Sequence, residues 1–137
     1  MNFKLIFNRI VLVSIGCIYF SAVHSQTQVG SDIDGETADD RCGWSVSLSS
    51  DGSTVAVGAR QNDGNGSNSG HVRIYKNISG TWTQQGSDID GEAASDQSGL
   101  TVSLRSDSSI VAIGASLNDV NGINSGHALL VCFSLIE

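Results

Sequence analysis

The stretch 45–59, "SVSLSSDGSTVAVGA", decides the fold class. Its first five residues, 45–49, alternate between serine and an aliphatic residue, which is the period-two pattern of a half-buried strand. Asp51 and Gly52 follow as a hairpin signal, because glycine adopts positive φ at little cost. Residues 54–59, "TVAVGA", are rich in residues that favour strands and predict a second strand.

Two further strands are expected downstream of this hairpin. Residues 62–70, "NDGNGSNSG", have the composition of a loop. Residues 71–77, "HVRIYKN", alternate again and predict a third strand, and Ser79-Gly80 turns the chain into a fourth at 81–85, "TWTQQ". Four strands joined by short turns predict an all-β fold built from antiparallel meanders of the kind that form propeller blades.

The predicted meander belongs to an internal repeat. Residues 30–71 align without a gap to residues 86–127 at a spacing of 56, and 28 of the 42 aligned positions are identical. The shared residues include "GSDIDGE" at 30–36 and 86–92, and "NSGH" at the end of each copy. A period near 50 with short strands is typical of β-propeller blades. We therefore expect two blades, with repeats at 26–85 and 86–137.

The order of these motifs resembles the FG-GAP type of β-propeller repeat, which also forms the head of integrin alpha chains. The resemblance rests on Gly43, "SVSLSSDGSTVAVGA", the Gly/Asn/Ser loop, "GHVRIYK" at 70–76, and "TW", and it extends to about His127. It implies a secreted or cell-surface protein, similar to bacterial proteins with many such copies. The family's Phe-Gly pair is replaced by Cys42-Gly43 and Ser98-Gly99.

The family's calcium hairpin has no full counterpart in this chain. Integrin-type repeats bind calcium between their first two strands through an Asp-x-Asp-x-Asp-Gly series. The equivalent segments here are "SSDG" at 49–52 and "RSDS" at 105–108, and each supplies one carboxylate. The resemblance therefore does not bring that calcium site to this sequence.

Residues 1–25 have the organisation of a signal peptide. Lys4 and Arg9 precede an apolar run at 10–20, and small residues follow, which predicts cleavage after Ser25. An uncleaved membrane anchor is the alternative, although the run is short for a span. The remaining chain carries five basic and 14 acidic side chains, a net charge of −9. That charge argues against nucleic acid and anionic membranes as partners.

The second copy departs from the first after His127. The first copy continues with "VRIYKNISGTWTQQ", whereas the second ends with "ALLVCFSLIE" at 128–137. The apolar run is consistent with a third strand or with a short buried helix. We expect a degenerate or truncated second blade. Because repeat units bury their apolar faces against neighbours, closing a propeller would require further blades or self-association.

Acidic side chains supply the candidate calcium ligands. The alternate spacing in "DIDGE" suits a calcium loop, but the glycine comes too early and the glutamate follows it at once. The loop at 62–70 offers further oxygens. For "DIDGE", an acidic connector between blades is favoured over calcium binding. For the loop at 62–70, a long turn is favoured. The candidates are Asp32, Asp34, Glu36, Asp63, Asn65, Asp88, Asp90 and Glu92.

Histidine and cysteine give two weaker hypotheses. His71 and His127 occupy equivalent positions and would suit zinc, but no acid or cysteine is expected beside them at repeat spacing, so a structural role is favoured. Cys42 and Cys132 are candidates for a disulfide in an oxidising compartment, although they occupy non-equivalent repeat positions.

Catalysis finds little support in the sequence. No nucleophile elbow, phosphate-binding loop or dinucleotide fingerprint occurs, and the acidic pairs are repeated turn residues. We therefore expect a non-enzymatic protein without a cofactor, which binds an extracellular protein or carbohydrate in adhesion. Two alternatives remain: a remnant of a longer propeller protein without a function of its own, and part of a propeller carbohydrate-active enzyme.

Overall fold

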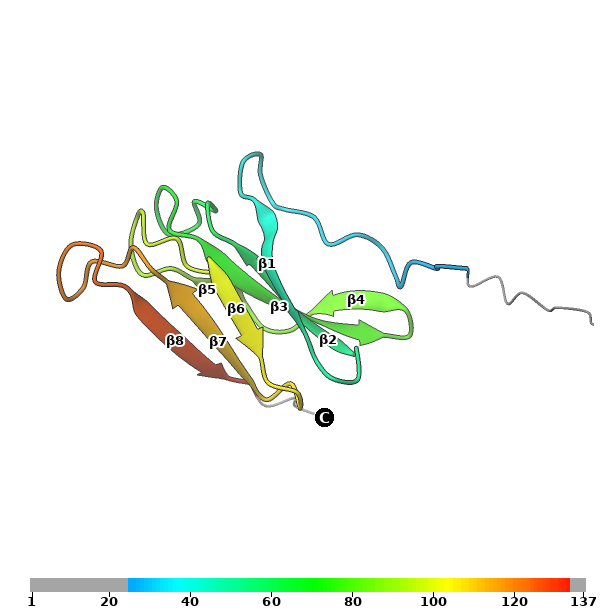
Figure 1. Cartoon of the computed structure of the whole chain (residues 1–137). Coiled ribbons are helices and arrows are strands. Elements are labelled where there is room, and N and C mark those ends of the chain that lie inside the picture. The colour runs from blue at the N-terminus through cyan, green and yellow to red at the C-terminus, as the bar shows by residue number, and fades with distance from the viewer. Residues whose placement is uncertain (1–24, 134–137) are drawn as a thin grey trace, which may run out of the picture.

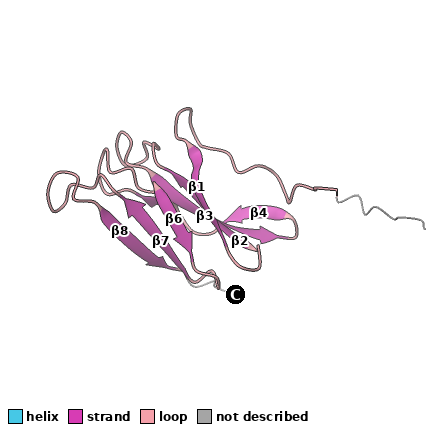
Figure 2. Ribbon diagram, viewed as in Figure 1, coloured by secondary structure: helices cyan, strands magenta, loops and turns pink. Residues whose placement is uncertain are grey.

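The computed structural model describes residues 25–133, and every regular element within them is a β-strand (Figure 1, Figure 2). The all-β fold predicted from the sequence is confirmed. The signal peptide predicted over residues 1–25 lies outside the described residues apart from Ser25. Within residues 25–133, no helix has the length and apolarity needed to cross a bilayer.

The first copy forms the predicted meander. Strands β1 (Cys42–Leu48), β2 (Thr54–Ala59), β3 (His71–Ile78) and β4 (Thr81–Gln84) are antiparallel neighbours in that order. β1 begins three residues before the predicted strand, because an irregular segment between Cys42 and Ser45 precedes the regular pairing. Gly43 lies in that segment with a φ of 79°, a conformation that suits glycine.

The second "GSDIDGE" segment completes the edge of the first sheet. Strand β5 (Ile89–Asp90) pairs antiparallel with the start of β3, with Asp90 opposite His71 and Ile89 opposite Val72. β4 pairs with the other end of β3, from Tyr75 onward. The connector between the copies is thus hydrogen-bonded to the first sheet rather than free.

The second copy forms a separate sheet of three strands within the described residues. β6 (Thr101–Leu104), β7 (Ile110–Ala115) and β8 (His127–Cys132) are antiparallel in that order. β8 resolves the ambiguity of the C-terminal apolar run in favour of a strand. Its alternate residues Leu129 and Val131 pair with Ile113 and Val111 of β7.

The main core lies between the two sheets, which face each other (Figure 1). The first sheet contributes small and branched residues, and the second contributes larger aliphatic ones. The buried members are Ala56, Val72, Ile74, Leu104, Val111 and Ile113. A second cluster covers the other face of the first sheet, where Ile33 of the N-terminal segment and Trp82 pack on Val55, Val57 and Tyr75.

Each sheet also has an outer face that is open to solvent at least in part, on the first sheet over β1. On the first sheet, Val46 and Leu48 of β1 are 58% and 56% exposed. On the second sheet, Ser103, Ala112 and Leu130 lie side by side across the strands, on the face turned away from the core. Leu130 is 67% exposed. Both open faces carry exposed apolar side chains.

Candidate functional site at the junction of the two copies

The two copies meet where the backbone of the second reaches the first sheet. Ser98 forms a parallel bridge with Gly70, and Ser98 N donates to Ser69 O at 2.8 Å. Gly99 lies directly against Gly58, so that a Cβ at Gly58 would clash with the Gly99 carbonyl. Glycine is therefore required at position 58 for this close approach.

Two serines of β1 fasten the junction. Ser45 Oγ donates to the Gly99 carbonyl at 2.7 Å, and Leu104 N donates to Ser47 Oγ at 2.9 Å. Both serines lie on the face of the first sheet that meets the second copy. The alternation "SVSLS" therefore puts hydroxyls on the face that contacts the next blade and aliphatic side chains on the other.

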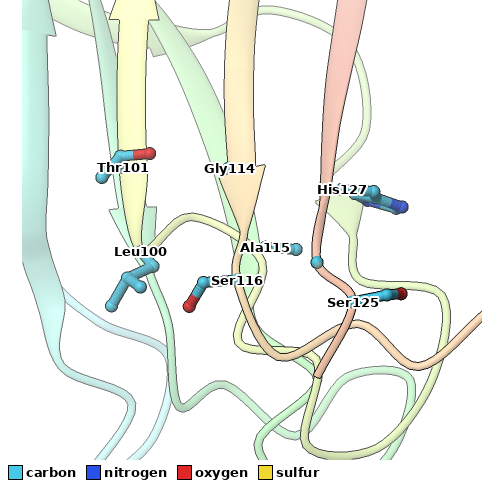
Figure 3. A pocket seen from close by; sticks show the side chains of 8 residues that line it. Leu100, Thr101, Gly114, Ala115, Ser116, Ser125 and His127 are labelled. Carbon is cyan, nitrogen blue, oxygen red and sulfur yellow. The ribbon is translucent and has the colours of Figure 1, made fainter. Parts of the chain in front are cut away.

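The second copy contains the equivalent of the surface that binds Ser98 and Gly99, here called the seat. No described residue fills the seat of the second copy. An open groove of about 400 Å³ is lined by Thr101, Gly114, Ser116, Gly126 and neighbouring residues (Figure 3). At a spacing of 56, these positions correspond to Ser45, Gly58, Arg60 and Gly70 of the first copy. In the first copy that seat holds Ser98 and Gly99.

The segment that would fit such a seat is open in the first copy. Gly43 is the equivalent of Gly99, and its φ of 79° matches the 81° of Gly99. A Cβ at Gly43 would meet no atom within 4 Å. The preceding loop also matches. Asp39 and Arg41 have φ of 69° and 56°, and their equivalents Ser95 and Gln97 have 71° and 52°.

A buried amide–carboxylate pair supports the loop of each copy. Asn62 Nδ2 donates to Asp40 Oδ2 at 3.1 Å, and Asn62 Oδ1 accepts from Gly64 N at 2.8 Å. The second copy repeats the arrangement, with Asn118 Nδ2 at 3.0 Å from Asp96 Oδ2. All four side chains of these two pairs are buried. Each pair ties the loop after the second strand to the loop before the first.

The charge of Asp40 is stabilised by its partners. Burial acts to raise the pKa of Asp40, but hydrogen bonds from Thr37 and Asn62 outweigh it and hold the pKa below its ordinary value of 3.8. Thr37 Oγ1 donates at 2.6 Å to Oδ1, and Thr37 N donates at 2.9 Å to Oδ2. Asp40 is therefore an ionised structural acceptor.

His71 lies beside two carboxylates at the edge where β3 meets β5. Its Nδ1 is 3.4 Å from Asp88 Oδ2 and 4.0 Å from Glu36 Oε2. Arg73 Nη1 is 3.6 Å from the other oxygen of Glu36. His71 is 1% exposed, and burial, together with the positive charge of Arg73, lowers its pKa despite the opposing effect of the neighbouring carboxylates. The ring is therefore neutral near pH 7.

The expectation that no acid accompanies the histidines at repeat spacing is wrong. Glu36 and Glu92 each precede a histidine by 35 residues, and Glu92 Oε2 is 3.5 Å from His127 Nδ1. Among the His, Cys, Asp and Glu side chains of residues 25–133, one group of three has all its potential metal-ligand atoms within 4.8 Å of one another. This group is Glu36, His71 and Asp88.

Several of the other calcium candidates have local partners, and Asp90 lies opposite His71 in the β3–β5 pair. Asp63 Oδ1 accepts from Asn68 N at 2.8 Å, as an ordinary turn residue does. Asn65 Nδ2 donates to the Gly91 and Glu92 carbonyls, which ties the 62–70 loop to the connector. Asp32 Oδ1 accepts from Gln28 Nε2 at 2.9 Å. Asp34 and Asp90 have exposed side chains, like Asp32 and Glu92.

Cys42 and Cys132, the cysteines within the described residues, are free thiols. Cys42 begins β1 in the first sheet, where its Sγ lies 3.7 Å from the Ile33 carbonyl. Cys132 ends β8 in the second sheet and is exposed. Cys42 and Cys132 lie in different sheets, and the disulfide considered from the sequence stays a prediction.

The hairpin that holds calcium in integrin-type repeats is closed here by serine. Asp51 Oδ1 accepts from Ser49 Oγ at 2.7 Å, Ser53 N at 3.0 Å and Ser53 Oγ at 2.9 Å. These hydrogen bonds lower the pKa of Asp51 to about 2. The single carboxylate is thus engaged with its own turn.

Sequence reasoning missed the buried acids and amides of the repeat, Asp40, Asn62, Asp96 and Asn118. The signal that could have found them is their identity at a spacing of 56, which Asp40 and Asp96 retain although most of their neighbours differ. Polar residues retained at equivalent positions of a repeat are candidates for buried hydrogen-bond partners.

Comparison with known proteins identifies the repeat. Residues 31–75 match the FG-GAP repeat family. No curated protein matches the chain. The matched segment contains β1, β2 and most of β3, the part of the first sheet that supplies the junction. The chain therefore carries an FG-GAP repeat, with residues 31–75 as the matched copy.

Proposed function

We propose that this protein is a non-enzymatic β-propeller module that associates head to tail with further copies of itself. The open face of the second sheet in one protein molecule would pack against the open face of the first sheet in the next molecule. The observation that carries this proposal is the groove at Gly114 and Gly126, which repeats the seat that Gly58 and Gly70 provide for Ser98 and Gly99.

The groove of one protein molecule would be filled by the Gly43 segment of another molecule. Thr101, equivalent to Ser45, would supply a hydroxyl to the Gly43 carbonyl, as Ser45 does to Gly99. Leu48 would be covered as Leu104 is, which is 8% exposed. Leu130 would be covered as Ile74 is, which is 3% exposed. Because Leu48 and Leu130 are 56% and 67% exposed, burying each would contribute about 1–2 kcal/mol.

Association of this kind is heterologous, because the two surfaces in contact differ. Such contacts form a closed ring when the rotation that relates one molecule to the next divides a full turn evenly. Propellers contain roughly four to eight blades, so two to four copies of a two-blade chain would complete one.

The assembled propeller would act outside the cell, as a secreted or surface-bound module that binds a protein or carbohydrate in adhesion. The FG-GAP repeat, the signal peptide predicted over residues 1–25 and the net negative charge of the chain support this location. The engagement of Asp40, Asp51 and Asp96 with structural donors supports a non-enzymatic role.

Complementary mutants provide the test. L48E blocks the face of the first sheet, and L130E blocks the face of the second. Analytical ultracentrifugation should show a discrete oligomer for the wild type and a folded monomer for each variant. An equimolar mixture of the two variants should form dimers, because each retains the face that the other lacks. I78E changes an exposed hydrophobic residue at the β3–β4 hairpin and should assemble like the wild type.

Other outcomes separate the alternatives. Variants that stay monomeric when mixed would contradict head-to-tail packing. A wild type that is unfolded or aggregated at all concentrations would favour a remnant of a longer propeller protein. Hydrolysis or lyase activity on a polysaccharide panel by the assembled wild type would favour the carbohydrate-active enzyme instead.

A further inference from the structure

The imidazole of His71 is a buried polar group without hydrogen-bond partners for either ring nitrogen among the described residues. This side chain is 1% exposed. Leaving buried polar atoms unpaired is costly, and such atoms call for an explanation. Nδ1 faces the carboxylates of Asp88 and Glu36 at 3.4 and 4.0 Å.

The three side chains have the spacing of ligands around a single ion. Zinc binds histidine nitrogen and carboxylate oxygen at about 2.0–2.2 Å, which puts neighbouring ligands of a tetrahedron roughly 3.3–3.6 Å apart. The His71–Asp88 separation of 3.4 Å falls within that range. The carboxylate of Glu36 is about half exposed, so a small rotation would bring its oxygen into range and leave an entry path for the ion.

The local charge favours a cation. Asp88, Glu36 and Asp90 all act on His71, and Arg73 is the one cation among them. Three carboxylates and one guanidinium leave two negative charges around a neutral ring. Arg73 approaches Oε1 of Glu36, whereas Oε2 is the oxygen nearer to His71, so the two interactions use different atoms.

We propose that Glu36, His71 and Asp88 bind a divalent transition-metal ion of the zinc type. The nitrogen ligand selects this class, because imidazole suits zinc, copper, iron and nickel. Calcium prefers six to eight oxygen ligands, which this group does not offer. The ion would give Nδ1 a partner and would join the start of the first copy, through Glu36, to the connector before the second, through Asp88. The site lies within one chain and does not depend on the proposed self-association.

Titration of the full-length protein with Zn²⁺ and with Co²⁺ tests the site. Isothermal titration with Zn²⁺ should give one saturable site per chain in the L130E variant, whether or not the wild type self-associates. Co²⁺ should give the visible absorption of a tetrahedral nitrogen–oxygen site without thiolate charge transfer, which distinguishes it from binding at Cys42 or Cys132. D88N and E36Q should each weaken Zn²⁺ binding more than about tenfold.

The matched control is Asp32→Asn, which changes the equivalent aspartate of the first "GSDIDGE" segment. D32N should bind Zn²⁺ like the L130E parent, and thermal stabilisation by Zn²⁺ should persist in D32N and disappear in D88N. The proposal would be overturned by absence of saturable binding, by equal affinities of D88N and D32N, by thiolate charge-transfer absorption, or by Ca²⁺ displacing Zn²⁺ at similar concentration.

Discussion

Gly43 and Gly99 occupy equivalent positions of the repeat, yet Gly99 is packed against the first sheet and Gly43 is open to solvent. Their φ angles, 79° and 81°, are almost the same. The local conformation is therefore set within each copy, before any neighbour contributes. The two glycines differ in their surroundings: a Cβ at Gly99 would meet the His71 carbonyl, whereas a Cβ at Gly43 would meet no atom within 4 Å.

Gly58→Ala tests how much the close approach of the copies contributes to stability. The new Cβ would collide with the Gly99 carbonyl, a backbone atom that cannot turn away. Gly114→Ala is the matched control, because there the nearest atom is the side-chain oxygen of Thr101. Both variants are compared in the L130E background, so that no second molecule fills the groove at Gly114. Urea unfolding should show G58A less stable than G114A by about 1–3 kcal/mol. Equal unfolding free energies would mean that the junction yields easily.

Asn62→Ala tests the buried pair with Asp40. The change removes a donor from the Asp40 carboxylate and leaves Gly64 N without its acceptor. The free energy of unfolding should fall by about 1–3 kcal/mol, as expected when buried polar groups lose their partners. N121A replaces an exposed asparagine of the equivalent loop in the second copy and should change stability by less than about 0.5 kcal/mol. A similar loss in both variants would contradict the role given to Asn62.

His71 predicts a dependence of stability on pH. Burial lowers its pKa in the folded protein below the ordinary value of 6.5, despite the facing carboxylates of Asp88, Glu36 and Asp90. The unfolded chain therefore binds a proton that the folded chain does not, so stability must fall as the pH drops below 6.5. Urea unfolding in the presence of a chelator, between pH 7 and pH 5, should show this slope in the wild type and in H127Q. H71Q should show a smaller slope, and an unchanged slope would contradict the assignment.

Asp51 offers a test of the serine-closed hairpin. Hydrogen bonds from Ser49 and Ser53 lower its pKa to about 2. A titration of the side-chain carboxyl followed by NMR should locate the midpoint near that value. S49A should raise the pKa toward 3.8, because it removes the strongest of these hydrogen bonds. A wild-type midpoint near 3.8 would show that the turn is open in solution.

Most of the fold could be predicted because it depends on local patterns. The alternation at 45–49, the Asp51-Gly52 turn and the strand at 54–59 each specify their own geometry, and the spacing of 56 showed that the unit occurs twice. The strand β5 could not be predicted from local patterns. "GSDIDGE" reads as a polar turn, and Ile89 and Asp90 pair with β3 only because the junction brings the connector to that edge.

The candidate site was harder to predict for the same reason. Glu36 and Asp88 were proposed as calcium ligands within their own acidic segments, and His71 was considered separately. Their grouping requires the connector to lie along the first sheet, which brings Asp88 beside His71, 17 residues before it, and Glu36, 52 residues before it. Spacing within one motif carries no information about such a contact.

The matching loop conformations before Gly43 and Gly99 have a kinetic consequence. Asp39 and Arg41 already adopt the left-handed φ values found in Ser95 and Gln97 beside the occupied seat. A partner would therefore meet a loop in its bound shape, and little conformational entropy would be lost on contact. Association should then proceed as a single bimolecular phase at about 10⁵–10⁷ M⁻¹s⁻¹, with no slower, concentration-independent step after the encounter.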